Sequence, residues 1–167
     1  MTISAENIKL YRSLFNTRDD VFARYWEDLQ NKKSGYAPVF RLNQSPLILT
    51  DSVIKSHLEG KQVIGVYPLF PDNTTNFLAI DFDGADWFNL IQKLANIASA
   101  NNLFCSIERS KSGNGGHVWF FFSERVPSHL ARQMGKQLLS EAGIKDRKTF
   151  EGLWKSNLFA IKWKICC

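Results

Sequence analysis

The expected fold depends first on one stretch, Phe77-Leu78-Ala79-Ile80-Asp81-Phe82-Asp83-Gly84. Its apolar residues predict a strand. Side chains alternate between the two faces of a strand, so Asp81 and Asp83 should share one face while the apolar side chains around them point into a core. Two carboxylates at this spacing can share a pair of Mg²⁺ or Mn²⁺ ions, which serve in phosphoryl or nucleotidyl transfer. The alternative is a plain strand end at an Asp-Gly turn.

A second stretch, residues 105–122, is expected to form a β-hairpin. Cys105–Ser110 and His117–Phe122 are β-prone, and the segment between them holds three glycines and an asparagine. Glycines such as Gly113 and Gly115 let backbone N–H groups approach a phosphate closely. The side chains expected to bind that phosphate are those of Arg109, Ser110, Lys111, Ser112 and His117. The turn lacks the P-loop pattern, and a flexible turn beside an ordinary strand histidine stays the alternative.

These two stretches resemble the first two motifs of the archaeo-eukaryotic primase superfamily. The motifs are Ile80-Asp81-Phe82-Asp83 and the segment from Glu108-Arg109-Ser110 to His117-Val118-Trp119. Within the superfamily, the sequence is most similar to the primase-polymerase domain of TOTE conflict systems. The likeness runs from about Gly65 to about Leu139, with a weaker trace in Val21–Trp26.

The resemblance implies template-directed nucleotidyl transfer with Mg²⁺ or Mn²⁺. It implies Asp81 and Asp83 as the catalytic metal ligands, and His117 with Ser112 as the residues that hold the phosphates of the incoming nucleotide. The implied partners are a nucleic acid template and primer, nucleoside triphosphates, and a helicase or nuclease of the same system. The implied activity is that of a DNA primase or polymerase in replication, with DNA and RNA both open as the template.

The sequence departs from the family where a third acidic residue is expected. After Gly143 the only acidic residues are Asp146 and Glu151, and neither lies in a familiar context. We therefore expect a chain whose C-terminal part is missing or divergent. Relatives often carry a cysteine cluster before the acidic strand, and Ala37–Thr50 has none, so no structural zinc is expected.

The expected fold class is α+β, an antiparallel or mixed sheet with flanking helices and a β-α-β-β order like half of an RNA-recognition unit. Three parts are predicted: 1–60 as an N-terminal part of the same domain, 61–143 as the catalytic core, and 144–167 as a divergent tail. Outside the hairpin, Val63–Leu69 and Phe77–Phe82 are expected to be strands that form a hairpin or lie next to each other. Phe159–Ile165 is expected to be an edge strand.

Helices are predicted from caps and apolar spacing. One follows Ser4, one spans Thr50–Glu59, one follows Asp86, and one runs from Pro127-Ser128 to Gly143 with Leu130 among its inward residues. A further helix is expected from Asn16-Thr17. Its aromatic stripe is expected to pack in the core, with base stacking as the alternative; the stripe comprises Val21, Phe22, Tyr25, Trp26 and Leu29.

Composition favours a single globular domain that meets nucleic acid or nucleotides. The chain has 167 residues, 44% of them hydrophobic, and 21 Lys and Arg against 16 Asp and Glu give a net charge of +5. The three cysteines are an odd number without a Cys-x-x-Cys pair, which favours a reducing, cytoplasmic setting. No signal peptide or membrane span is expected, and therefore no membrane partner.

Two other functions are compatible with parts of the sequence. Asp81-Phe82-Asp83-Gly84 also resembles the first motif of haloacid-dehalogenase phosphatases, but a threonine is expected where Ala85 stands, and the hairpin would be unexplained. The other alternative is an inactive nucleic-acid-binding module of the primase fold. Such a module would hold a strand with Trp119, Phe121 and basic residues, and would not need the two aspartates.

Overall fold

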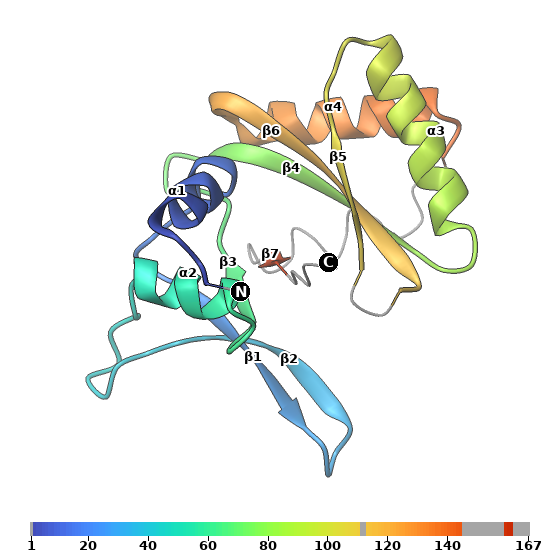
Figure 1. Cartoon of the computed structure of the whole chain (residues 1–167). Coiled ribbons are helices and arrows are strands. Elements are labelled where there is room, and N and C mark those ends of the chain that lie inside the picture. Colours follow the sequence, from blue (N-terminus) through green and yellow to red (C-terminus); the bar gives the residue numbers. More distant parts are fainter. Residues whose placement is uncertain (1, 111–112, 145–158, 162–167) are drawn as a thin grey trace. The chain divides into compact units, whose positions relative to one another are not determined.

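The computed structural model describes residues 2–110 and 113–144 and the backbone of residues 159–161. The elements, in chain order, are α1 (Ala5–Leu14), β1 (Ala23–Asp28), β2 (Lys33–Pro38), α2 (Asp51–Leu58), β3 (Ile64–Val66), β4 (Thr74–Asp83), α3 (Trp87–Ala100), β5 (Ser106–Arg109), β6 (Gly115–Pro127), α4 (Ser128–Glu141) and β7 (Phe159–Ile161) (Figure 1). The α+β class is confirmed. No helix in these residues is long and apolar enough to cross a bilayer.

The chain divides into two compact units, Met1–Phe70 with Asn157–Cys167, and Pro71–Ser156. The first unit holds a sheet of order β2-β1-β3-β7, and the second holds a sheet of order β4-β6-β5. All pairs in both sheets are antiparallel. The three-part division predicted from the sequence stays a prediction.

The second unit contains both stretches that the sequence singled out. β6 is the central strand, with β4 on one side and β5 on the other. In the β4–β6 register Asp81 lies opposite His117 and Asp83 lies opposite Gly115. In the β5–β6 register Glu108 lies opposite His117. The predicted hairpin and the β-α-β-β order are confirmed, and the pairing aligns three polar residues across three strands.

Alternation along β4 separates a core from the candidate site. Leu78, Ile80 and Phe82 are almost fully buried. They pack against side chains of α3 and α4, namely Ile91, Leu94, Ala98, Leu138 and Leu139, so both helices cover the same face of this sheet (Figure 1). Because the period of a strand is two, the aspartates point to the opposite face, as predicted.

The helix predicted from Asn16-Thr17 is wrong, because Ala23–Asp28 forms strand β1 instead. β1 pairs along its whole length with β2. Asp28 supports the turn between them by accepting hydrogen bonds from the backbone N–H groups of Gln30 and Asn31. Aromatic residues suit a strand that has a partner, and this tertiary pairing overrides the helical spacing.

The predicted aromatic stripe is therefore divided between faces. Val21 and Phe22 are buried, whereas Trp26 is 43% exposed and Leu29 is 82% exposed. Tyr25 packs against Tyr36 of β2, with ring centroids 5.3 Å apart. Trp26 points to the other face of the hairpin, since neighbouring residues alternate. Base stacking on this hairpin stays a prediction.

Two further predictions about packing are wrong. Val63–Leu69 contains β3, but β3 pairs with β1 and β7 rather than with β4. Leu130 is 49% exposed, because the inward side chains of α4 are those of Ala131, Leu138 and Leu139. Strand pairing over a long sequence separation is not encoded in local composition, so the first error could not be seen from spacing.

The predicted helix starts are mostly confirmed. Ser4 caps α1 by accepting from the backbone N–H of Asn7, and Thr50 caps α2 in the same way through Val53. Asp86 occupies the N-cap position of α3 but makes no cap hydrogen bond, because its carboxylate accepts from the Asn89 side chain instead. α4 begins directly after Pro127, as expected.

Candidate active site

The candidate site is built on a row of side chains that crosses the sheet of the second unit. His117 Nε2 lies 3.1 Å from Asp81 Oδ1, and His117 Nδ1 lies 3.5 Å from Glu108 Oε2. The exposed fractions of these side chains are 15% for His117, 37% for Asp81 and 17% for Glu108. The structure thus brings the predicted metal ligand and the predicted phosphate ligand into direct contact.

The two contacts of His117 differ in kind. The 3.1 Å contact with Asp81 has the length of a hydrogen bond. Nδ1 makes no hydrogen bond within the described part of the chain, so the 3.5 Å contact with Glu108 is a charge contact. His117 therefore lies between two carboxylates, one bonded and one held slightly further away.

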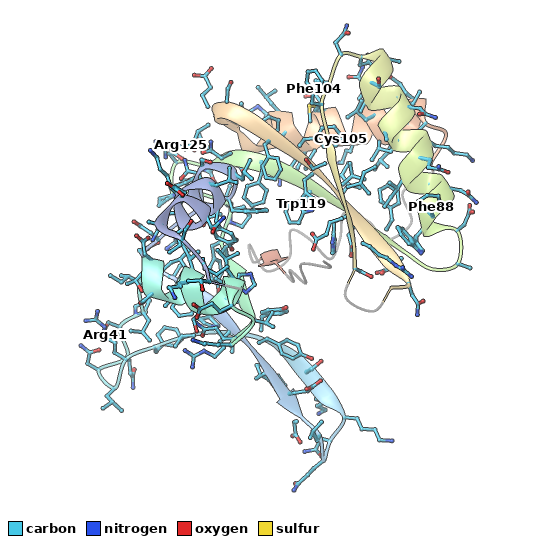
Figure 2. All side chains as sticks on the ribbon, in the orientation of Figure 1. Arg41, Phe88, Phe104, Cys105, Trp119 and Arg125 are labelled. Carbon is cyan, nitrogen blue, oxygen red and sulfur yellow. The ribbon has the colours of Figure 1, made fainter. Side chains whose placement is uncertain are left out.

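Trp119 fixes the outer carboxylate of this row. Its indole N–H donates to Glu108 Oε2 over 3.0 Å. Figure 2 shows Trp119 on the side of the sheet turned away from α4, and its side chain is only 2% exposed. Its ring packs against Phe77 and stacks parallel to Phe121. Trp119, predicted as a base-stacking residue in the binding-module alternative, is buried in this arrangement.

The sequence prediction did not place Glu108 in the site, although the residue stands in the quoted motif. The missing information was the register of the hairpin. Once Ser110 and Gly115 close the turn, the backbone pairing puts Glu108 directly opposite His117. Counting residues back from the turn on both strands would have placed Glu108 in the site, because directly opposed residues share a face.

Asp83 lies beside the glycine-rich turn at the end of β4. A Cβ atom built on Gly115 would come within 2.6 Å of Asp83 Oδ1 and 2.6 Å of the Phe82 carbonyl oxygen. The same position is 3.4 Å from Ser110 Oγ. The absence of a side chain at Gly115 thus lets the second carboxylate and the turn approach each other closely.

The turn is closed by its own hydrogen bonds. Ser110 N–H donates to the Gly115 carbonyl, and Gly113 N–H donates to the Ser110 carbonyl. The Arg109 guanidinium donates from Nε and Nη2 to the Gly113 carbonyl, over 3.2 and 3.1 Å. Gly113 has φ +79°, which favours glycine. Lys111 and Ser112 lie outside the described residues, so the predicted phosphate contact of Ser112 stays a prediction.

Arg109 bonds the backbone of the turn that follows it through its guanidinium. Its predicted contact with a phosphate of the nucleotide stays a prediction. An arginine that spans a turn in this way restricts the turn's conformation. Its positive charge remains at the exposed edge of β5, next to the turn where an anion is expected.

The surroundings of His117 favour its charged form. Burial lowers its pKa, but the contacts with Asp81 and Glu108 outweigh burial and raise the pKa from 6.5 to about 9. The pKa is higher in the folded chain than in the unfolded chain. The stabilisation that protonation brings is therefore complete below about pH 6.5 and is lost as the pH rises through about 9.

We expect His117 to be a cation at neutral pH in the metal-free protein. A histidine NMR titration should show its ring titrating near pH 9, and Asp81→Asn should lower that pKa because the hydrogen-bonded carboxylate is replaced by a neutral amide. A ring of the wild-type protein that titrates at or below pH 6.5 would contradict the described contacts.

The chemistry of the two aspartates fits a hard divalent cation. Both carboxylates lie on one face at the end of β4; Asp81 is partly exposed and Asp83 is exposed. The residues described by the structure contain no group of three or more His, Cys, Asp or Glu side chains arranged to hold a metal ion. Asp146 and Glu151, the acidic residues noted in the sequence, lie outside the described residues.

One protein family matches most of this chain. Residues 6–153 match the family described as the archaeo-eukaryotic primase domain of TOTE conflict systems. The chain belongs to this family. The recognition made from the two motifs is thus confirmed, and nothing in the comparisons supports the haloacid-dehalogenase alternative.

Two solved structures that share this fold are a polymerase domain and a primase-polymerase domain. The polymerase domain of Ligase D from Mycobacterium tuberculosis, in complex with DNA, has a TM-score of 0.55 and 13% identity, covering 93% of this chain and 70% of that chain. The archaeo-eukaryotic primase (AEP) domain of the cyanophage S-2L primase-polymerase has a TM-score of 0.51 and 12% identity. The match covers 96% of this chain and 83% of that chain. No curated protein matches the sequence.

Proposed function

We propose that this archaeo-eukaryotic primase domain is a template-directed nucleotidyltransferase that uses two divalent metal ions. The observation that carries the proposal is the 3.1 Å contact between Asp81 and His117. It joins a ligand suited to a hard cation and a cationic donor suited to a phosphate, on neighbouring strands. A metal–triphosphate complex contains both a cation for Asp81 to bind and phosphate oxygens that can accept from His117.

In the proposed site, Asp81 and Asp83 hold Mg²⁺ or Mn²⁺. Metal ions held by these carboxylates would supply charge neutralisation for the triphosphate and activation of a 3′-hydroxyl. The Asp83 carboxylate lies next to Gly115, and Asp81 would give up its contact with His117 in order to hold a cation. No covalent intermediate with the protein is involved, since the two carboxylates act as ligands rather than as nucleophiles.

The remaining residues bind and orient the phosphates. His117, released from Asp81, donates from Nε2 to a phosphate oxygen. Ser110, Ser112 and the backbone amide of Gly115 are the other proposed donors, while Gly113, whose N–H donates to the Ser110 carbonyl, shapes the turn that carries them. Arg109 acts by holding the turn and by its charge. Fixed donors of this kind stabilise the charge that develops on the triphosphate during transfer.

The proposed partners are a nucleic acid template with its primer and nucleoside triphosphates. The net charge of +5 is suited to a polyanion. The Ligase D domain with the same fold was solved with DNA. A helicase or nuclease of the same conflict system and a cytoplasmic setting remain part of the proposal.

The direct test is isothermal titration of a nucleoside triphosphate into the full chain with and without Mn²⁺. We expect binding only when the metal is present, because without it the triphosphate faces the charges of Asp81 and Asp83. Equal binding in both conditions, or none in either, would overturn the assignment of the metal and nucleotide site. Primer extension on a primed DNA template then tests transfer itself.

A further inference from the structure

Glu108 is rigidly supported on one side. Its Oε2 atom accepts the hydrogen bond of the Trp119 indole over 3.0 Å. Trp119 in turn is held between neighbours, with ring centroids 5.8 Å from Phe77 and 6.2 Å from Phe121, the latter ring being parallel within 2°. A carboxylate bonded to a buried, well-packed indole has little freedom to change its position.

On its other side Glu108 faces His117. The same Oε2 atom lies 3.5 Å from Nδ1, while Nε2, at the far edge of the imidazole, lies 3.1 Å from Asp81. The Trp119 ring also contacts the imidazole, with centroids 5.9 Å apart. The ring is thus oriented by Glu108 and Trp119 together, and Nε2 is directed to the side where the nucleotide is expected.

We propose that Glu108 is the positioning residue of His117: anchored by Trp119, it fixes the imidazole so that Nε2 is presented to the triphosphate when Asp81 takes up the metal ion. This assignment rests on the proposed nucleotide site. Glu108 touches neither metal nor nucleotide and acts only through His117. In this respect it resembles the carboxylates that orient the histidine ligands of metal sites, whose loss typically costs about 10- to 100-fold in affinity.

Two other roles for Glu108 predict different results. As a metal ligand, it would have to share a cation with Asp81, yet the His117 ring stands between the two carboxylates. As a simple negative charge beside an anion site, it would repel the triphosphate, so its removal would tighten binding. Positioning predicts the opposite sign, namely weaker binding with unchanged affinity for the metal alone.

The test uses three single substitutions in the full chain. Glu108→Gln removes the charge but keeps the size and an oxygen that can accept from Trp119. Trp119→Phe removes the indole N–H and keeps an aromatic ring. Glu124→Gln is the matched control, since Glu124 is exposed and lies on β6 away from His117. Thermal unfolding verifies that each variant is folded, and titration calorimetry measures Mn²⁺ alone and a nucleoside triphosphate with Mn²⁺.

We expect Glu108→Gln to weaken triphosphate binding about 10-fold and Trp119→Phe about threefold, with Mn²⁺ binding unchanged and Glu124→Gln equal to the wild type. Unchanged or tighter triphosphate binding in Glu108→Gln would overturn the assignment. Loss of Mn²⁺ binding in that variant would also overturn it, because Glu108 would then be a ligand.

A second measurement separates this inference from the proposed function. The ring ¹⁵N signals of His117, identified by their loss in His117→Ala, should move in Glu108→Gln and Trp119→Phe but not in Glu124→Gln, all in nucleotide-free protein at pH 7. Unmoved signals would overturn the positioning role. If the wild type fails to bind triphosphate while these signals move, the proposed function fails and the control of the imidazole by Glu108 stands.

Discussion

Replacement of both Asp81 and Asp83 by asparagine is expected to abolish metal-dependent binding of nucleoside triphosphate. The two carboxylates at the end of β4 are the proposed metal ligands, and asparagine keeps their size while removing both charges. Titration calorimetry with Mn²⁺ should show at least about a 100-fold loss of affinity. Where the wild type extends a primer, the double variant should be slower by about 10³-fold or more, equivalent to about 4 kcal/mol of lost transition-state stabilisation.

The same double variant also distinguishes an enzyme from a binding module. A module that has kept only the fold does not need the carboxylates, so it should bind single-stranded DNA at least as tightly after both negative charges are removed. Asp72→Asn is a suitable control, since Asp72 is an exposed aspartate in the turn before β4 and pairs with Arg125. Wild-type affinity for the metal–triphosphate complex in the double variant would contradict the proposed site.

Substitution of the two adjacent glycines of β6 by alanine should have two different effects. In Gly115→Ala the new methyl group would meet Asp83 Oδ1 and the Phe82 carbonyl oxygen, each at 2.6 Å. The carboxylate must then move, so metal-dependent triphosphate binding should fall by about 10- to 100-fold. This effect falls on the face of the sheet that carries the site.

In Gly116→Ala the methyl group points into the core. It would approach Ile91 Cδ1 to 2.7 Å, Trp87 Cζ3 to 2.8 Å and the Glu108 carbonyl oxygen to 2.9 Å. Overpacking of this kind lowers the free energy of unfolding by about 1–3 kcal/mol, which corresponds to several degrees in Tm.

The two glycine variants serve as controls for each other, because the chemical change is the same and the positions are adjacent. Thermal stability should fall in both variants, because each new methyl group also meets a backbone carbonyl oxygen. Triphosphate binding at a temperature where both are folded should be affected more by Gly115→Ala. Equal effects of the two on both measurements would contradict the separation of core and site across the sheet.

Local sequence was sufficient to predict the strands and helices of the second unit, which carries the candidate site. The alternation around Asp81 and Asp83, the glycine-rich turn and the helical spacing after Asp86 and Ser128 each depend on residues close together in the chain. The two motifs were also sufficient to recognise the family, which the match over residues 6–153 confirms. These features need only the periods of helices and strands and the special backbone freedom of glycine.

Only the tertiary structure decided which strands pair and which side chains meet. Val21–Trp26 has helical spacing, but pairing with β2 makes Ala23–Asp28 a strand, and β3 joins β1 rather than β4. The contact of Glu108 with His117, and the use of Arg109 to close the turn, depend in the same way on register and on hydrogen bonds. A shift of one residue in register would move Glu108 to the other face, so its role could not be seen until the strands were placed side by side.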